Sequence, residues 1–200
     1  MIELLQFRFA GERSYLHSTD LYDSCVGMVR RHFRVFTLRD LALKVQHWTA
    51  NNILATDEPS ELPGIGEFRC LINLRQNVNI GLHDSDTPIF GTHEFDEQRI
   101  TGQARTNAGV AVLSKNVAES DAHCIVALNK LLLSEVQPLE DTEQWAFTRM
   151  TASIYTDYTD YSQHPLILHF RRRLRSTYIS DYAIETIAKG EVWFTRTPRQ

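Results

Sequence analysis

The sequence has no apolar run near the roughly 20 residues that a membrane-spanning helix needs. Its first residues, Met1-Ile2-Glu3, lead directly into a strand-like segment, without the basic and apolar stretches of a secretory leader. Only three cysteines are present, Cys25, Cys70 and Cys124, and their wide spacing indicates neither a disulfide framework nor a zinc site. We therefore expect a cytoplasmic protein with no membrane contact, whose cysteines are buried and reduced.

The sequence also has no excess of basic residues. Its 21 Lys and Arg stand against 25 Asp and Glu, for a net charge of -4, so nothing in the total charge indicates nucleic-acid binding. Glycine-rich nucleotide motifs and the G-x-S-x-G of serine hydrolases are missing as well. The segments 83–86 and 93–96 combine histidine with carboxylates, but not at the spacing of a zinc motif. We expect neither a cofactor nor a bound metal.

The chain divides into predicted elements whose order repeats. The first half is predicted to contain a strand at 2–9, a helix at about 18–32, strand segments at 33–48, a loop at 51–66, a strand at 67–82 and a polar junction at 83–94. The second is predicted to contain a strand region at 100–113, a helix at 120–136, and strands at 145–154, 166–187 and 191–195. The second copy begins about one hundred positions after the first.

Two details support a duplication. Cys25 of the first predicted helix corresponds to Cys124 of the second, and Leu74-Arg75 recurs as Leu174-Arg175. We predict two halves, residues 1–90 and 91–200, that together form one pseudo-dimeric domain, because a unit of about one hundred residues has only a small core.

This repeated order resembles the double hot-dog fold superfamily of thioesterase-like and dehydratase-like proteins. The resemblance implies an α+β fold of two hot-dog-like halves, each a curved antiparallel sheet wrapped around one long helix. A generic α+β sandwich, with both helices on one face of a single sheet, is the alternative. The continuous apolar runs at 125–128 and 131–133 favour a helix that is covered on more than one side.

The resemblance also implies a function. Hot-dog enzymes usually process acyl thioesters, so we expect an enzyme of the thioesterase or dehydratase type that acts on acyl-CoA or on an acyl carrier protein. It leaves open whether two chains form a homodimer. The alternatives are a non-catalytic binding or scaffold protein for an acyl ligand, and an interaction protein for an acidic partner.

The start of the first helix is the candidate site that the resemblance implies. Asp20 would be the general base, His17 an acid/base partner and Tyr22 a hydrogen-bond donor, beside the helix N–H groups that can polarise a carbonyl. The alternative is that Ser18 or Asp20 only caps the helix and that His17 is a solvated loop residue. Neither the thioesterase pattern of Asp followed closely by Gly-His nor the dehydratase His-Phe-Pro is present, so the reaction stays open.

A basic strand at 169–175 is the second candidate feature. In a regular strand, His169, Arg171, Arg173 and Arg175 share one face. Arg171, Arg173 and Arg175 are predicted to bind the phosphates of coenzyme A or an acidic carrier protein; the alternative is pairing with Asp181 or Glu185. Arg172, between Phe170 and Leu174, requires a buried partner or a bulge.

Overall fold

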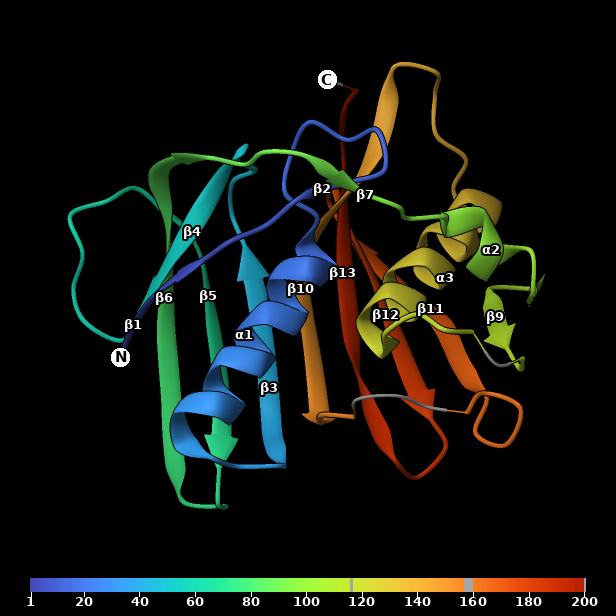
Figure 1. Cartoon of the computed structure of the whole chain (residues 1–200). Helices are drawn as coiled ribbons and strands as arrows, with labels where there is room; N and C mark the ends of the chain where they lie inside the picture. Colours follow the sequence, from blue (N-terminus) through green and yellow to red (C-terminus); the bar gives the residue numbers. More distant parts are fainter. Residues whose placement is uncertain (116, 157–159, 200) are drawn as a thin grey trace. The chain divides into compact units, whose positions relative to one another are not determined.

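The structure is a computed structural model that describes residues 1–115, 117–156 and 160–199 (Figure 1). The chain forms two compact units, Met1–Asp96 and Glu97–Gln200. Each unit contains one helix of 16 residues and an antiparallel sheet. No helix of the described residues is long and apolar enough to cross a membrane.

The first unit begins and ends with short strands around a helix and four longer strands. Its elements are β1 (Ile2–Leu5), β2 (Phe9–Ala10), α1 (Ser18–Phe33), β3 (Leu38–Val45), β4 (Asn51–Thr56), β5 (Gly64–Ile72), β6 (Gln76–Pro88) and β7 (Thr92–His93). Within this unit the sheet order is β1-β4-β6-β5-β3, and every pair is antiparallel. The short strands β2 and β7 form a separate parallel pair.

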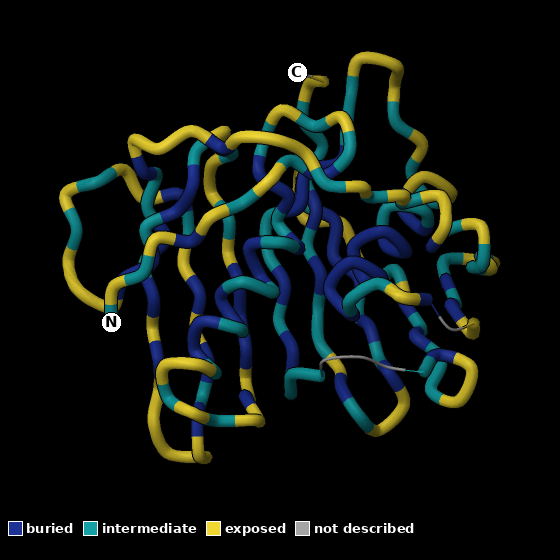
Figure 2. Tube along the Cα trace, in the orientation of Figure 1, coloured by how far each residue is buried: buried dark blue, intermediate teal, exposed yellow. Residues whose placement is uncertain are grey.

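The core of the first unit lies between α1 and its sheet. Leu21, Cys25, Met28 and Val29 recur at helical spacing and are all buried, which confirms the predicted helix. In β5, Phe68, Cys70 and Ile72 alternate with exposed or half-buried residues, the pattern of a strand with one face in the core (Figure 2).

The second unit has a short first helix and then the long one. Its elements are α2 (Glu97–Thr101), β8 (Ala104–Asn107), β9 (Val110–Leu113), α3 (Asp121–Val136), β10 (Glu143–Ile154), β11 (Leu166–Leu174), β12 (Thr177–Ile184) and β13 (Ala188–Pro198). Within this unit the sheet order is β10-β13-β12-β11-β9-β8, again antiparallel throughout. Helix α3 packs against β8, β9, β11 and β13 and is buried over most of its surface, as its apolar runs predict.

Several expectations about elements are wrong. Residues 51–66 were expected as a loop but contain β4, because Pro59, Pro63 and Gly64 affect only the second part of the segment while Ile53 and Ala55 alternate into the core. The junction expected at 83–94 is partly strand, since β6 continues to Pro88. The strand expected at 67–82 is a hairpin of β5 and β6, and the strand region expected at 166–187 is a hairpin of β11 and β12. All three cysteines are free and buried, as expected.

Candidate active site

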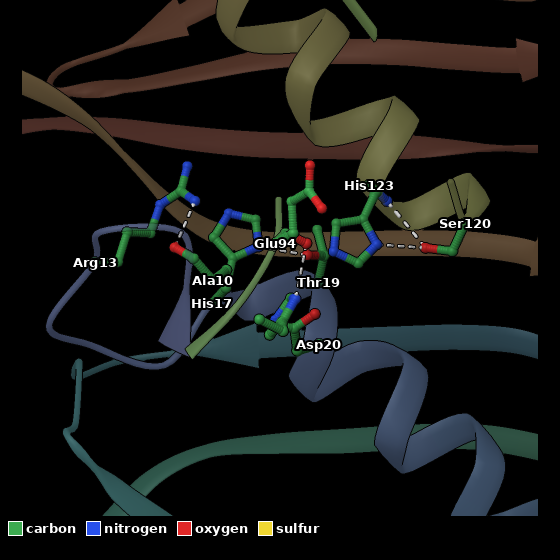
Figure 3. A network of polar contacts seen from close by, with 9 residues as sticks. Ala10, Arg13, His17, Thr19, Asp20, Glu94, Ser120 and His123 are labelled. Carbon is green, nitrogen blue, oxygen red and sulfur yellow. Dashed lines mark hydrogen bonds and ion pairs between the residues drawn. The ribbon is translucent and has the colours of Figure 1, made fainter. Parts of the chain in front are cut away.

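The start of α1 is built differently from the expected cap. The helix begins at Ser18, and His17 occupies the N-cap position without a side-chain capping bond. The His17 side chain is buried, at 4% exposure, and its Nδ1 lies within hydrogen-bond distance of Thr19 Oγ1 (Figure 3). Both parts of the simple alternative are therefore wrong: neither Ser18 nor Asp20 is the cap, and His17 is not solvated.

Asp20 lies in the first turn of α1 and contacts a residue of the expected polar junction at 83–94. Its Oδ2 is 3.2 Å from Nε2 of His93, at the end of β7. The other ring nitrogen of His93, Nδ1, is 3.2 Å from the backbone oxygen of Glu94. The side chain of Asp20 is 16% exposed and that of His93 is 35% exposed, so the pair is reachable from solvent. A carboxylate in the first turn is also favoured by the partial positive charge of the helix start.

Each ring nitrogen of His93 contacts a hydrogen-bond acceptor. A backbone carbonyl and a carboxylate are both hydrogen-bond acceptors, whereas a neutral imidazole has only one N–H. A histidine in direct contact with a carboxylate is a combination of groups that general acid–base chemistry uses.

A cavity of about 630 Å³ opens beside this pair. Its size is within the range of small-molecule binding sites. Asp20 and His93 line it together with Asn52 of β4, Thr87 and Pro88 at the end of β6, and four residues outside strands: Gln6, Phe7, Arg8 and Phe90. Arg8 gives this wall a positive charge, and the rings of Phe7 and Phe90 give it apolar surface.

Asn52 fixes the two segments that form the cavity wall. Its side chain is buried, its Oδ1 accepts from the backbone N–H of Phe7 at 2.9 Å, and its Nδ2 donates to the backbone oxygen of Pro88 at 3.1 Å. The segments are also joined where Phe9 N–H donates to the oxygen of Gly91 at 3.0 Å. Asn52 therefore holds both sides of the opening, although the sequence analysis placed it in a loop.

Tyr22 is in a different environment from Asp20. It is 5% exposed, and its ring packs edge-on against Phe68 of β5 with centroids 6.0 Å apart. Of the three predicted catalytic residues, the described lining of the cavity includes Asp20 but neither His17 nor Tyr22. Tyr22 thus packs in the core of the unit.

Side chains of the histidine–carboxylate segment at 83–86 form hydrogen bonds with neighbouring loops. His83 Nδ1 lies 3.0 Å from the backbone oxygen of Leu62, and Asp84 Oδ1 accepts from the Thr49 hydroxyl at 2.9 Å. These bonds tie β6 to the neighbouring loops, which gives the segment a structural role.

Helix α3 begins with a conventional cap, unlike α1. Ser120 Oγ accepts from the backbone N–H of His123 and lies 2.8 Å from His123 Nδ1 (Figure 3). The next residue, Asp121, is buried and accepts a hydrogen bond from the hydroxyl of Tyr161. Burial, the nearby Cys124 and Asp121 together raise the pKa of Tyr161 far above its ordinary value, so the phenol stays protonated.

The basic strand of the second unit does not present one column of arginines. A bulge between Phe170 and Arg172 shifts the register, so Arg173 lies opposite Tyr178 of β12. Its guanidinium is 5.2 Å from the centre of that ring. Arg171 instead contacts Asp181, at 3.3 Å. Asp181 and Tyr178 lie on opposite faces of β12, so Arg171 and Arg173 also lie on opposite faces.

The three predicted binding arginines therefore differ. Arg171 is held by two carboxylates, Asp181 and Glu191, the second at 2.6 Å. This confirms the alternative of pairing with Asp181, whereas Glu185 contacts His164 instead. Arg175 lies past the end of β11, with φ of 56°. The bulge predicted as one way to keep the charge of Arg172 out of the core is present, and Arg172 is exposed.

The fold defines the class: the chain has the hot-dog fold. No protein-family model matches the sequence, and no curated protein does. Among solved structures, the chain is similar to the dehydratase domain from the CurJ module of curacin polyketide synthase, with a TM-score of 0.55 and 7% identity over 94% of this chain and 85% of that one. It is also similar to the tesB protein MAP1729c of Mycobacterium avium subs paratuberculosis, with a TM-score of 0.52 and 6% identity over 98% of this chain and 92% of that one.

Proposed function

We propose that the protein is an enzyme that processes acyl thioesters, and that the cavity of the first unit is its active site. The observation that carries this proposal is the Asp20–His93 pair at the wall of a 630 Å³ cavity, at the start of the long helix of a hot-dog fold. The dehydratase domain among the structural neighbours supports the same class of chemistry. We propose acyl-CoA or an acyl carrier protein as the donor of the acyl group.

The pair supplies a base and an acid to the same substrate. In hydrolysis, a water oxygen attacks the thioester carbonyl carbon while the water proton passes to Asp20; the C–S bond then breaks and the leaving thiolate takes the proton of His93. In dehydration, Asp20 takes a proton from the carbon next to the carbonyl, and the β-hydroxyl group leaves as water with the proton of His93. The N–H groups of the first turn of α1 stabilise the negative charge on the carbonyl oxygen in both cases.

Tests with two substrate sets distinguish these reactions. Acyl-CoA thioesters of several chain lengths report hydrolysis through the released thiol, and 3-hydroxyacyl thioesters report dehydration through the conjugated product. We expect turnover of one set, and a fall in kcat of about 10²-fold or more in Asp20→Asn. Asp86→Asn, an exposed acid of β6, is the matched control and keeps its activity.

Two outcomes contradict the proposal. Turnover that is unaffected by Asp20→Asn removes Asp20 from the mechanism. A co-purified acyl ligand without turnover on either set indicates the non-catalytic binding protein instead. His17 and Tyr22 are proposed to support the site through packing, and His17→Ala is expected to lower stability more than it lowers kcat.

We also propose that Arg173 and Arg175 contact the phosphates of coenzyme A or an acidic carrier protein. Arg171 contributes less, because Asp181 and Glu191 already neutralise it. A rise in KM for acyl-CoA in Arg173→Ala and Arg175→Ala, with little change in Arg171→Ala, supports this order; equal effects of all three contradict it.

We further propose that the two units are copies of one hot-dog unit, each with its sheet wrapped around its long helix. The support is that α1 and α3 have equal length and that each contains a buried cysteine, Cys25 in α1 and Cys124 in α3. The matching Leu-Arg pairs both lie where a hairpin turns, after β5 and at the end of β11. Superposition of the two units in a crystal structure tests this, and helices on opposite faces of their sheets would refute it.

A further inference from the structure

A second hollow, of about 320 Å³, lies at the other end of α1. It is formed by the segment that follows the helix, residues 34–37 and 39, and by the turn between β5 and β6. Arg34, which lines the hollow, follows Asp20 by fourteen positions along α1. At a rise of 1.5 Å per residue this is about 21 Å, so the hollow is remote from Asp20. An inference about it does not depend on the proposed catalytic function.

The hollow is bordered by large apolar side chains that are open to solvent. Phe36 is 85% exposed and Leu74 is 66% exposed. Single exposed apolar residues are common, but two on the rim of one concavity are typical of an interaction surface.

The backbone under Leu74 is unfavourable for that residue. Arg75 N–H donates to the oxygen of Ile72, which closes a turn whose central residues, Asn73 and Leu74, have φ of 50° and 58°. Two positive φ values define the type I′ pattern, for which glycine is the preferred second residue. A leucine here is strained, and its side chain is exposed.

The charge around the hollow is positive, in contrast to the chain as a whole. Arg34, Arg39 and Arg75 are all exposed, and in the described part of the chain none of them forms an ion pair. Asp40 is the exposed acid beside them. The charged residues in the described lining of the hollow are Arg34 and Arg39, so its wall is basic in a protein of net charge -4.

We propose that this hollow is a docking site for an acidic segment of a partner protein. One apolar side chain of the segment enters the hollow between Phe36 and Leu74, and carboxylates on either side contact Arg34 and Arg39. An amphipathic helix with acidic flanks has this chemistry. The concave shape favours a protein segment over a lipid surface, which would require apolar side chains that project from a convex face.

The probe is a fluorescein-labelled amphipathic helical peptide with leucines on one face and glutamates on the other, measured by fluorescence anisotropy against the full chain. Two matched peptides replace the glutamates by lysine or the leucines by serine. We expect the acidic amphipathic peptide to bind more tightly than both, with an affinity that falls as salt is raised. In a separate experiment, binding of the full chain to vesicles of phosphatidylcholine with phosphatidylglycerol is measured, to distinguish a protein partner from a membrane.

Variants locate the site. Arg34→Glu with Arg39→Glu is expected to weaken peptide binding at least tenfold, whereas Arg105→Glu, a charge reversal of one exposed arginine of β8, has little effect. Leu74→Gly distinguishes binding from folding: it relieves the turn and raises the midpoint of thermal unfolding, yet it weakens peptide binding.

Three results would overturn the proposal. The first is equal binding of the acidic, basic and serine peptides. The second is peptide binding that is unchanged in both Arg34→Glu/Arg39→Glu and Leu74→Gly. The third is vesicle binding that depends on the same residues while the peptide does not bind, which assigns the surface to membranes.

Discussion

Nε2 of His93 lies 3.2 Å from Oδ2 of Asp20, although 73 positions separate the two residues in the sequence. Helix α1 holds the carboxylate, and the pairing of β7 with β2 holds the imidazole. The backbone bond from Gly11 N–H to the His93 oxygen, 2.9 Å long, fixes the position of the histidine further. The pair is therefore positioned by secondary structure.

Because Asp20 and His93 are in direct contact, we expect their substitutions to be non-additive. Asp20→Asn and His93→Asn should each lower kcat by about 10²-fold or more, and the double variant should be no slower than the slower single variant. Steady-state kinetics of the four proteins on the best thioester substrate measure this coupling. Independent, multiplying effects would show that the two residues do not act as a unit.

Asn52 links the two segments of the cavity wall, so its loss should affect both stability and substrate binding. Asn52→Ala removes the acceptor of Phe7 N–H and the donor to the Pro88 oxygen, and we expect a loss of about 1–3 kcal/mol in the free energy of unfolding. We also expect KM to rise more than kcat falls, because the wall moves while the Asp20–His93 pair stays in place.

Asn77→Ala is the control for this substitution, since Asn77 is an exposed residue at the other end of β6. Urea unfolding and steady-state kinetics of the two variants make the comparison. Equal stability of both variants would show that Asn52 does not hold the wall.

The helices could be predicted from the sequence because a helix is a local pattern. Cys25 and Cys124 lie in apolar stripes of 3.6-residue period, and both helices are present with nearly the expected bounds. Strand β4 was missed because the prediction assigned the whole segment 51–66 to a loop. Pro59 and Pro63 interrupt regular structure only after the strand has ended at Thr56.

The site was only half predictable, because its parts come from distant segments. Asp20 was found through its place at a helix start, but nothing local in the sequence indicates that His93 would face it. The column of arginines failed for a related reason: strand alternation assumes a regular register, and one extra residue at Arg171 moves Arg173 to the other face.

Gly66 occupies a position where a side chain cannot fit. A Cβ there would lie 2.2 Å from the backbone oxygen of Lys44 in β3, and backbone cannot move as a flexible side chain does. We expect Gly66→Ala to lower the free energy of unfolding by about 2 kcal/mol or more. Gly64→Ala, in the same strand and with open space around it, should change stability by less than about 0.5 kcal/mol. Similar urea midpoints for the two variants would contradict the predicted clash.

The buried thiols of the first unit should make it less stable in alkali. Burial, and then the nearby Cys70, Asp23 and Glu3, raise the pKa of Cys25 well above its ordinary value, and burial raises the pKa of Cys70 to about 11. Above about pH 8.5 the unfolded chain loses these protons while the folded chain keeps them. The unfolded state then binds fewer protons, so stability is constant below that pH and falls by up to about 1.4 kcal/mol per pH unit and thiol above it.

Urea unfolding between pH 7 and pH 9.5 measures this slope before tyrosines of the unfolded chain titrate. Cys25→Ala lowers stability at every pH because it leaves a cavity, but it should also make the alkaline slope shallower by one thiol. The change of slope, rather than the lower baseline, reports titration, since a cavity has no pH dependence. Parallel curves for wild type and Cys25→Ala would mean that the thiol of Cys25 ionises equally in both states, and hence that it is not enclosed between α1 and its sheet.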